Sequence, residues 1–244
     1  MDYDIVIRNG LVIAPTGRAY AAVGIRDGRI AEVGDCRGSA TEEVDAKNKL
    51  VFPGCIDPHT HLQNNRGSDA SMSKLILEES AGAAIGGVTT IATTTIIGTD
   101  PLVEHLAVAK RICSGQSYVD YRLTLQPLVS KHINEMADLT EQGSNLYKFY
   151  LGFKGAEAEH FGMPSSGLDL GFVYRGFRML AQCDGAALAL VHAEEPYLGD
   201  ECRKVAMAGD KADLEVWNTA SPPECEMIDI YKAAVVAEAV GCRL

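Results

Sequence analysis

The strongest constraint on this chain is a repeated alternation of short apolar runs with longer helical segments after residue 54. The pattern predicts strands over 55–62, 89–97, 119–128, 146–153 and 186–194, and helices over 72–86, 101–114, 131–142, 170–184, 201–208 and 223–240. Asp100-Pro101 is a helix-start signal, while Gly115 and Gly143 follow helix ends. Strands that alternate with helices build βα units around a parallel sheet. We therefore expect an α/β fold over residues 53–244.

The first 52 residues have a different pattern. Short β-type runs cover 5–7, 23–25, 30–33 and 43–52. Asn9-Gly10 is a strong turn dipeptide, and Asp27-Gly28 between two apolar runs is a hairpin signal, because both turn positions favour positive φ. We expect a small, mostly antiparallel, β-sandwich-like unit over 1–52, followed by a second domain over 53–244.

Composition excludes several classes of protein. The 244 residues carry a formal net charge of −11, which argues against a nucleic-acid partner and against an anionic membrane surface. No apolar run reaches the length of a membrane span, and the N-terminus has no apolar signal core. Seven scattered cysteines without a CxxC pair do not form a disulfide framework. A cytoplasmic protein is expected.

The segment 53–62 (PGCIDPHTHL) carries the clearest chemical signal. His59 and His61 stand at i and i+2, so on a strand their imidazoles project from the same face and can converge on one metal ion. The alternative is that each histidine is a hydrogen-bonded polar residue at a strand end. The spacing, the preceding Pro-Gly and the nearby Asp57 favour metal binding.

Two further strands carry candidate residues. His192 ends the apolar strand 186–194, as a third ligand or as a capping residue. Lys148 lies inside an apolar, aromatic strand, where burial lowers the pKa of its amine. Such an amine can add carbon dioxide and become an anionic carbamate. The alternative is an interior lysine paired with a carboxylate, or one facing solvent, and spacing alone favours that alternative.

Taken in order, these motifs resemble the amidohydrolase superfamily. The HxH pair ends a first barrel strand, 86–90 (GGVTT) opens the second, Lys148 lies in the fourth and 191–194 (VHAE) ends the fifth. The chain is most similar to the cyclic amidase branch, which contains dihydropyrimidinase, D-hydantoinase and allantoinase. The resemblance covers essentially the whole chain. It implies a TIM-type (β/α)8 barrel, here truncated after about five βα units.

The resemblance also implies roles for the candidate residues. His59 and His61 would bind the more buried of two divalent metal ions, zinc being the first expectation. A carboxylated Lys148 would bridge both ions, and His192 would bind the second. A metal-bound hydroxide would open the ring of a small cyclic amide or ureide, such as a dihydropyrimidine or a hydantoin. Asp57 would orient the HxH strand, and the tetrameric family implies a homo-oligomer.

Two departures from the family pattern stand out. A family tyrosine that supports the tetrahedral intermediate is replaced by Phe153 as the substrate-binding residue, and strand alternation predicts that Tyr150 points to the opposite face. The family takes a further histidine from strand six and its general base, an aspartate, from strand eight. We find no general base retained and keep only His160 as a spare histidine. The part after residue 52 is shorter than the about 250 residues of a closed barrel, so we expect a catalytically incomplete chain.

A competing hypothesis is a non-catalytic, dihydropyrimidinase-related scaffold that works through oligomer contacts. Such a scaffold does not need His59, His61, Lys148 and His192 together, and their joint presence favours descent from an enzyme. The polar loop 63–71 is expected over the metal face, where it contacts substrate or is merely solvated.

Overall fold

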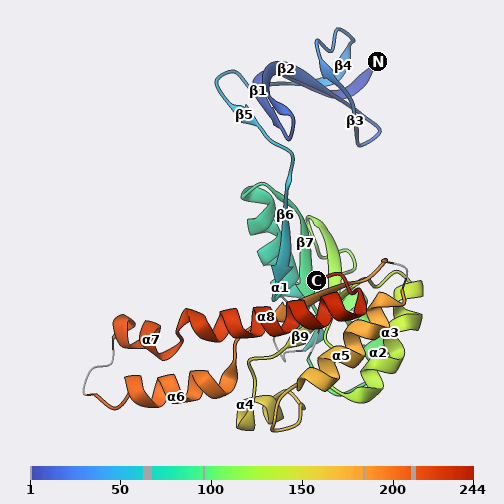
Figure 1. Ribbon diagram of the computed structural model, residues 1–244. Helices are drawn as coiled ribbons and strands as arrows, with labels where there is room; N and C mark the ends of the chain where they lie inside the picture. Colours follow the sequence, from blue (N-terminus) through green and yellow to red (C-terminus); the bar gives the residue numbers. More distant parts are fainter. Residues whose placement is uncertain (1, 63–67, 96, 184, 210–212) are drawn as a thin grey trace. The chain divides into compact units, whose positions relative to one another are not determined.

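The computed structural model describes residues 2–62, 68–95, 97–183, 185–209 and 213–244 (Figure 1). The chain divides into two compact units, Met1–Cys55 and Ile56–Leu244. Each unit is described by itself below. The expected domain boundary between residues 52 and 53 stays a prediction.

The first unit is one mixed β-sheet. Its strands are β1 (Tyr3–Ala14), β2 (Gly17–Arg26), β3 (Arg29–Gly34), β4 (Ala40–Asp45) and β5 (Leu50–Val51). The order is β3-β2-β1-β4, and β5 also pairs with β1. Asp27 and Gly28 have φ of 53° and 69° and form the expected hairpin turn between β2 and β3.

Two local expectations in this unit are wrong. Asn9-Gly10 is not a turn but an irregularity inside β1, where the register with β2 shifts and Asn9 has φ of 63°. The expected single strand 43–52 is split into β4 and β5, with Asn48 at φ of 62° between them. Both pieces run parallel to β1, so the sheet is less antiparallel than expected. A dipeptide that favours positive φ can form either a turn or a β-bulge, and the local sequence does not show which of these two structures it forms.

The second unit is a parallel sheet with helices after its strands. The strands are β6 (Cys55–Thr60), β7 (Val88–Thr94), β8 (Asp120–Leu125), β9 (Leu146–Tyr150) and β10 (Leu188–His192), in the order β10-β9-β8-β7-β6. The registers of β7 with β8, β8 with β9 and β9 with β10 are parallel. The predicted fold class, a TIM-type barrel truncated after about five strands, is confirmed.

The helices agree with the predicted segments to within a few residues, except at α6. They are α1 (Asp69–Ile85), α2 (Leu102–Cys113), α3 (Ser130–Glu141), α4 (Gly155–His160), α5 (Leu170–Ala181), α6 (Pro196–Ala206), α7 (Leu214–Ala220) and α8 (Pro223–Val240). Short α4 and α7 were not expected. The N-cap of α2 is Pro101, one residue later than Asp100 suggested. Among the described residues, no helix is long and apolar enough to cross a membrane.

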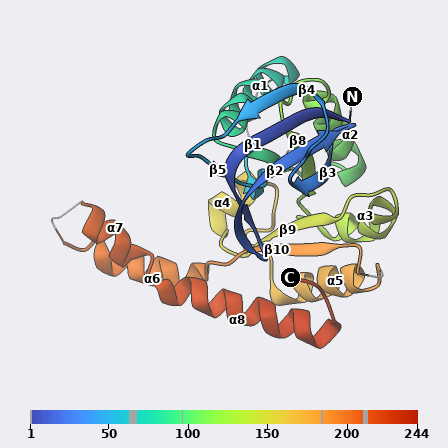
Figure 2. The ribbon, with the colours of Figure 1, turned by 90° about the horizontal axis from the view of Figure 1, so that it is seen from above.

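The core lies between the sheet and its helices α2, α3 and α5 (Figures 1 and 2). Tyr147 and Phe149 of β9 are fully buried there. The Tyr147 hydroxyl donates to the Met136 carbonyl of α3 at 2.9 Å, and Phe149 packs edge-on to Phe177 of α5. Because side chains alternate along a strand, Lys148 lies on the opposite, inner face of the sheet. Helix α8 packs beside α5 and closes this layer (Figure 2).

Candidate functional site

Two imidazoles converge at the carboxyl end of β6. His59 lies in the strand and His61 directly follows it, and their Nε2 atoms are 3.0 Å apart. The backbone N–H of His59 donates to Asp57 Oδ1 at 3.1 Å, which fixes the local backbone between the two residues. The i, i+2 spacing therefore presents two ring nitrogens to one point in space.

Lys148 reaches the same point from β9. Its side chain is buried, with 6% of the residue exposed, and its Nζ lies 3.5 Å from His59 Nε2. Burial lowers the pKa of this amine. A strand three places from β6 in the sheet thus brings a buried amine to the histidine pair of β6.

The electrostatics and geometry of this cluster suit a divalent metal ion. Burial, and next the positive charge of Lys148, lower the pKa of His59 to about 4, and burial also lowers the pKa of His61. Metal ligands must be unprotonated, as both rings then are near neutral pH. Two nitrogens that each lie about 2.1 Å from a tetrahedral ion are about 3.4 Å apart, close to the observed 3.0 Å. The described structure also gives buried His59 Nδ1 no hydrogen-bond partner.

His192 ends β10 but faces a different neighbour. Its Nε2 lies 3.4 Å from Glu194 Oε2, and the Ser221 hydroxyl donates to the other oxygen of Glu194 at 2.9 Å. Within the described ranges, no three His, Cys, Asp or Glu side chains gather as a metal-binding group. The structure therefore brings His59, His61 and Lys148 into contact, whereas the polar neighbour of His192 Nε2 is Glu194.

Aromatic rings line the site next to His192. Phe153 stacks on His192 with centroids 5.9 Å apart, and on Phe161 at 5.0 Å. Tyr150 also stacks on Phe153, at 5.2 Å, so the expectation that Tyr150 and Phe153 point to opposite faces is wrong. Strand β9 ends at Tyr150 and the chain turns before Phe153, so strand alternation does not extend that far.

The remaining candidates lie elsewhere. His160 ends α4 and contacts the Phe161 ring. Residues 63–67 of the loop expected over the metal face lie outside the described residues, and Ser68 caps α1 by accepting from the Ser71 N–H. Their participation in the site stays a prediction.

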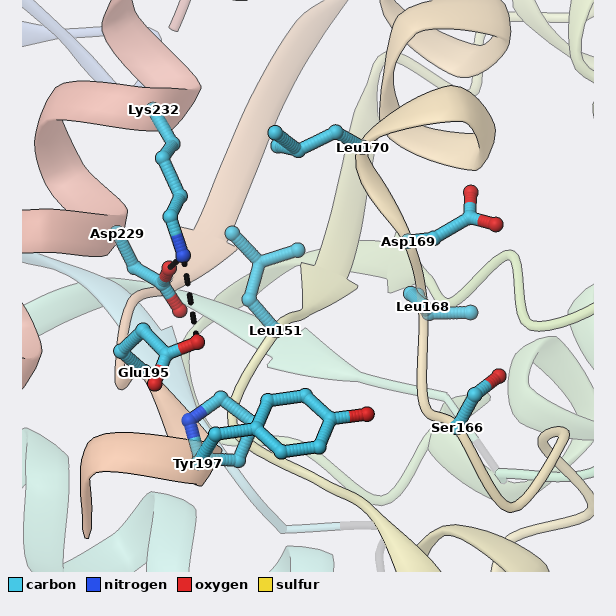
Figure 3. A pocket seen from close by; sticks show the side chains of 10 residues that line it. Leu151, Ser166, Leu168, Asp169, Leu170, Glu195, Tyr197, Asp229 and Lys232 are labelled. Atoms are coloured by element: carbon cyan, nitrogen blue, oxygen red, sulfur yellow. Dashed lines mark hydrogen bonds and ion pairs between the residues drawn. The ribbon is translucent and has the colours of Figure 1, made fainter.

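A second charged cluster, absent from the sequence analysis, anchors the loop after β10 (Figure 3). Glu195 caps α6 by accepting from the Leu198 N–H at 2.7 Å. Lys232 of α8 lies 3.4 Å from Glu195 and 3.0 Å from buried Asp229, beside a recess of about 230 Å³. The i, i+3 spacing of Asp229 and Lys232 was the available signal. These contacts hold the loop that carries Glu194 against α8.

Solved structures share this arrangement of strands and helices. The chain superposes on an L-hydantoinase (dihydropyrimidinase) from Arthrobacter aurescens with a TM-score of 0.84 and 22% identity, over 99% of this chain and 52% of that one. A D-hydantoinase structure gives a TM-score of 0.81 at 26% identity, over 98% and 50%. The fold is therefore that of the hydantoinase-type barrels, of which the described residues form five strands.

Curated relatives match along the whole chain. An allantoinase from Bacillus licheniformis is 27% identical over all of this chain and 53% of its own length. A D-hydantoinase from Rhizobium radiobacter is 29% identical over 99% of this chain and 51% of its own. No protein-family model matches. The predicted resemblance to the cyclic amidases, which are hydrolases, is confirmed, and the chain spans about half the length of the curated relatives it matches.

Proposed function

We propose that this chain carries part of the active site of a metal-dependent hydrolase that opens small cyclic amides or ureides. The observation that carries the proposal is the His59–His61–Lys148 cluster at one end of a hydantoinase-type sheet. The relatives named allantoinase and D-hydantoinase support the substrate class.

In this proposal His59 and His61 hold one divalent ion, zinc first, and Lys148 as its carbamate also contacts a second ion that His192 holds. Bound divalent ions would supply Lewis-acid activation of water and of the amide carbonyl. His192 binds only after its Nε2 turns from Glu194, and Ser221 holds that carboxylate at a fixed place. The electrostatic influence of His192 on both His59 and His61 supports this grouping.

Other residues would position a substrate. Phe153 stacks on His192 and on Phe161 and would add apolar aromatic surface beside a substrate ring, with no hydroxyl to donate. Asp57 keeps the backbone of His59 in place through its hydrogen bond. The general base that the resemblance assigns to an eighth barrel strand has no counterpart in the five-stranded parallel sheet of the described residues. We therefore propose that the 244-residue polypeptide by itself turns over slowly.

Metal binding tests the proposal directly. Purified protein, stripped with a chelator and titrated with zinc, is expected to bind the metal. His59→Ala and His61→Ala each are expected to abolish binding at the first site, whereas His160→Ala serves as a matched control and is expected to bind normally. Absence of zinc binding by the folded wild type, or unchanged binding by His59→Ala, would overturn the proposal.

A turnover assay complements the binding experiment. Dihydrouracil, hydantoin and allantoin are supplied to the zinc-loaded chain, and ring opening is followed by chromatography. Little or no hydrolysis is expected. Rapid, chelator-sensitive turnover lost in His59→Ala would support the hydrolase but contradict the proposed incompleteness.

Self-association and location are also proposed. Helices α6 to α8 expose large apolar side chains, among them Val205, Leu214, Trp217 and Tyr231. Their burial between copies would support a homo-oligomer, which light scattering measures. The seven cysteines are scattered along the chain with no CxxC pair, which supports a reducing, cytoplasmic location. Thiol titration of protein isolated without reductant tests it.

A further inference from the structure

A buried amide lies beside Lys148 in the inner face of the sheet. The β8–β9 register pairs Thr124 with Leu146 and Leu125 with Tyr147, so its next step brings Gln126 level with Lys148. Leu125 and Tyr147 face the helices, and alternation therefore turns Gln126 and Lys148 together toward the inner face. Gln126 belongs to none of the family motifs discussed above.

The orientation of the Gln126 amide is fixed. Its Nε2 donates to the Thr95 carbonyl of the neighbouring chain segment at 2.6 Å. A backbone carbonyl can only accept a hydrogen bond, so the amide atom that faces Thr95 must be the nitrogen. The other polar atom of the amide is then the acceptor Oε1. Gln126 is 0% exposed, and Oε1 is buried with no hydrogen-bond partner in the described structure. An acceptor left in this state is costly, which indicates that a donor belongs there.

Lys148, once converted to its carbamate, has an N–H donor that needs an acceptor. The amine attacks the carbon of carbon dioxide, an N–C bond forms, and one N–H proton leaves to solvent, giving –NH–COO⁻ with no change in oxidation state. The two carbamate oxygens are acceptors that suit metal ions, but the nitrogen keeps one N–H. That N–H is a donor in a buried place, since only 6% of Lys148 is exposed.

We propose that Gln126 is a positioning residue that accepts this N–H through Oε1 and so stabilises Lys148 as its carbamate. The inference rests on the proposed function. His59 Nε2, the present 3.5 Å neighbour of Nζ, is turned toward a metal in that state and is not the acceptor. Lys148 reaches His59 of β6 from β9, and β8 with Gln126 lies between these strands in the sheet.

Nuclear magnetic resonance tests this without relying on activity. The zinc-loaded protein is incubated with ¹³C-bicarbonate, and the carbamate carbon signal is integrated. Gln126→Met removes the acceptor, together with the Nε2 donor to Thr95, but keeps an unbranched side chain of similar length. Gln126→Leu is a second variant in case the first does not fold. Thr124→Val is the matched control, because it removes the other buried, unpartnered side-chain oxygen two residues away on the same face.

The wild type and Thr124→Val are expected to show the carbamate. The Gln126 variants, folded as judged by circular dichroism, are expected to lose it by about tenfold at the same carbon dioxide concentration, the size of effect that loss of a partner for a buried donor produces. An equal carbamate signal in wild type and in both Gln126 variants would overturn the inference and leave the proposed function intact. A wild type that binds zinc but shows no carbamate would overturn the inference together with the role proposed for Lys148.

Discussion

His132 is the side chain whose replacement most directly tests how the loops at the carboxyl end of the sheet are held. It is fully buried at the start of α3. Its Nδ1 accepts from the Leu128 N–H at 3.0 Å, and its Nε2 donates to the Asp100 carbonyl at 2.9 Å. One neutral ring therefore ties the loop after β7 to the loop after β8.

We expect His132→Phe to lower the free energy of unfolding by about 2–4 kcal/mol. The phenyl ring fills most of the space, so the loss comes from two hydrogen bonds and from a buried Leu128 N–H left without an acceptor, at about 1–3 kcal/mol for such an orphan. Urea unfolding followed by the helical circular dichroism signal measures this loss, because the helices lie in the unit 56–244. His160→Phe, at an exposed position, is the control and is expected to change stability by less than about 0.5 kcal/mol.

The same ring predicts a pH dependence. Burial is the main cause that lowers the pKa of His132 below its ordinary value of 6.5, against the opposing influence of Asp100 and Glu135. Below about pH 6.5 the unfolded state takes up a proton that the folded state rejects, so stability falls as the pH drops toward the folded-state pKa. His105, 6.2 Å away, is shifted in the same direction, so the variant keeps part of the dependence.

The difference in stability between wild type and His132→Phe is therefore expected to shrink as the pH falls from 7.5 to 5.5. A difference that stays constant over this range, or a variant as stable as wild type at pH 7.5, would refute the reasoning.

Three further predictions concern packing and the loops of the site. Gly176→Ala should destabilise by about 1–3 kcal/mol, because an added Cβ would lie 2.5 Å from the Phe149 ring; thermal unfolding measures it, and an unchanged midpoint would contradict it. Lys232→Met should lower stability by about 1–3 kcal/mol and weaken binding of a second zinc ion, since the Glu195 anchor of the loop after β10 is lost. Calorimetry measures the loss of stability and the zinc affinity separately, and an unchanged second-site affinity would limit Lys232 to a purely structural role. Phe153→Tyr should raise residual zinc-dependent hydrolysis by about tenfold, because a hydroxyl is added beside His192; equal turnover would exclude a donor role there.

The sequence by itself determined the fold class and most of the elements that support the site. Apolar runs alternating with helical segments predicted β6 to β10 and six of the helices, because hydrophobic periodicity is a local property. The spacing of His59 and His61 likewise predicted convergence, since residues at i and i+2 of an extended segment share a face.

Only the tertiary structure decided which distant groups meet. Lys148 reaches His59 across intervening strands, and Gln126 becomes notable only when the register sets it beside Lys148. Tyr150 and Phe153 share one stack because the strand ends between them. Such contacts depend on strand order, register and loop path, which arise from packing over the whole sheet and leave no short-range pattern in the chain.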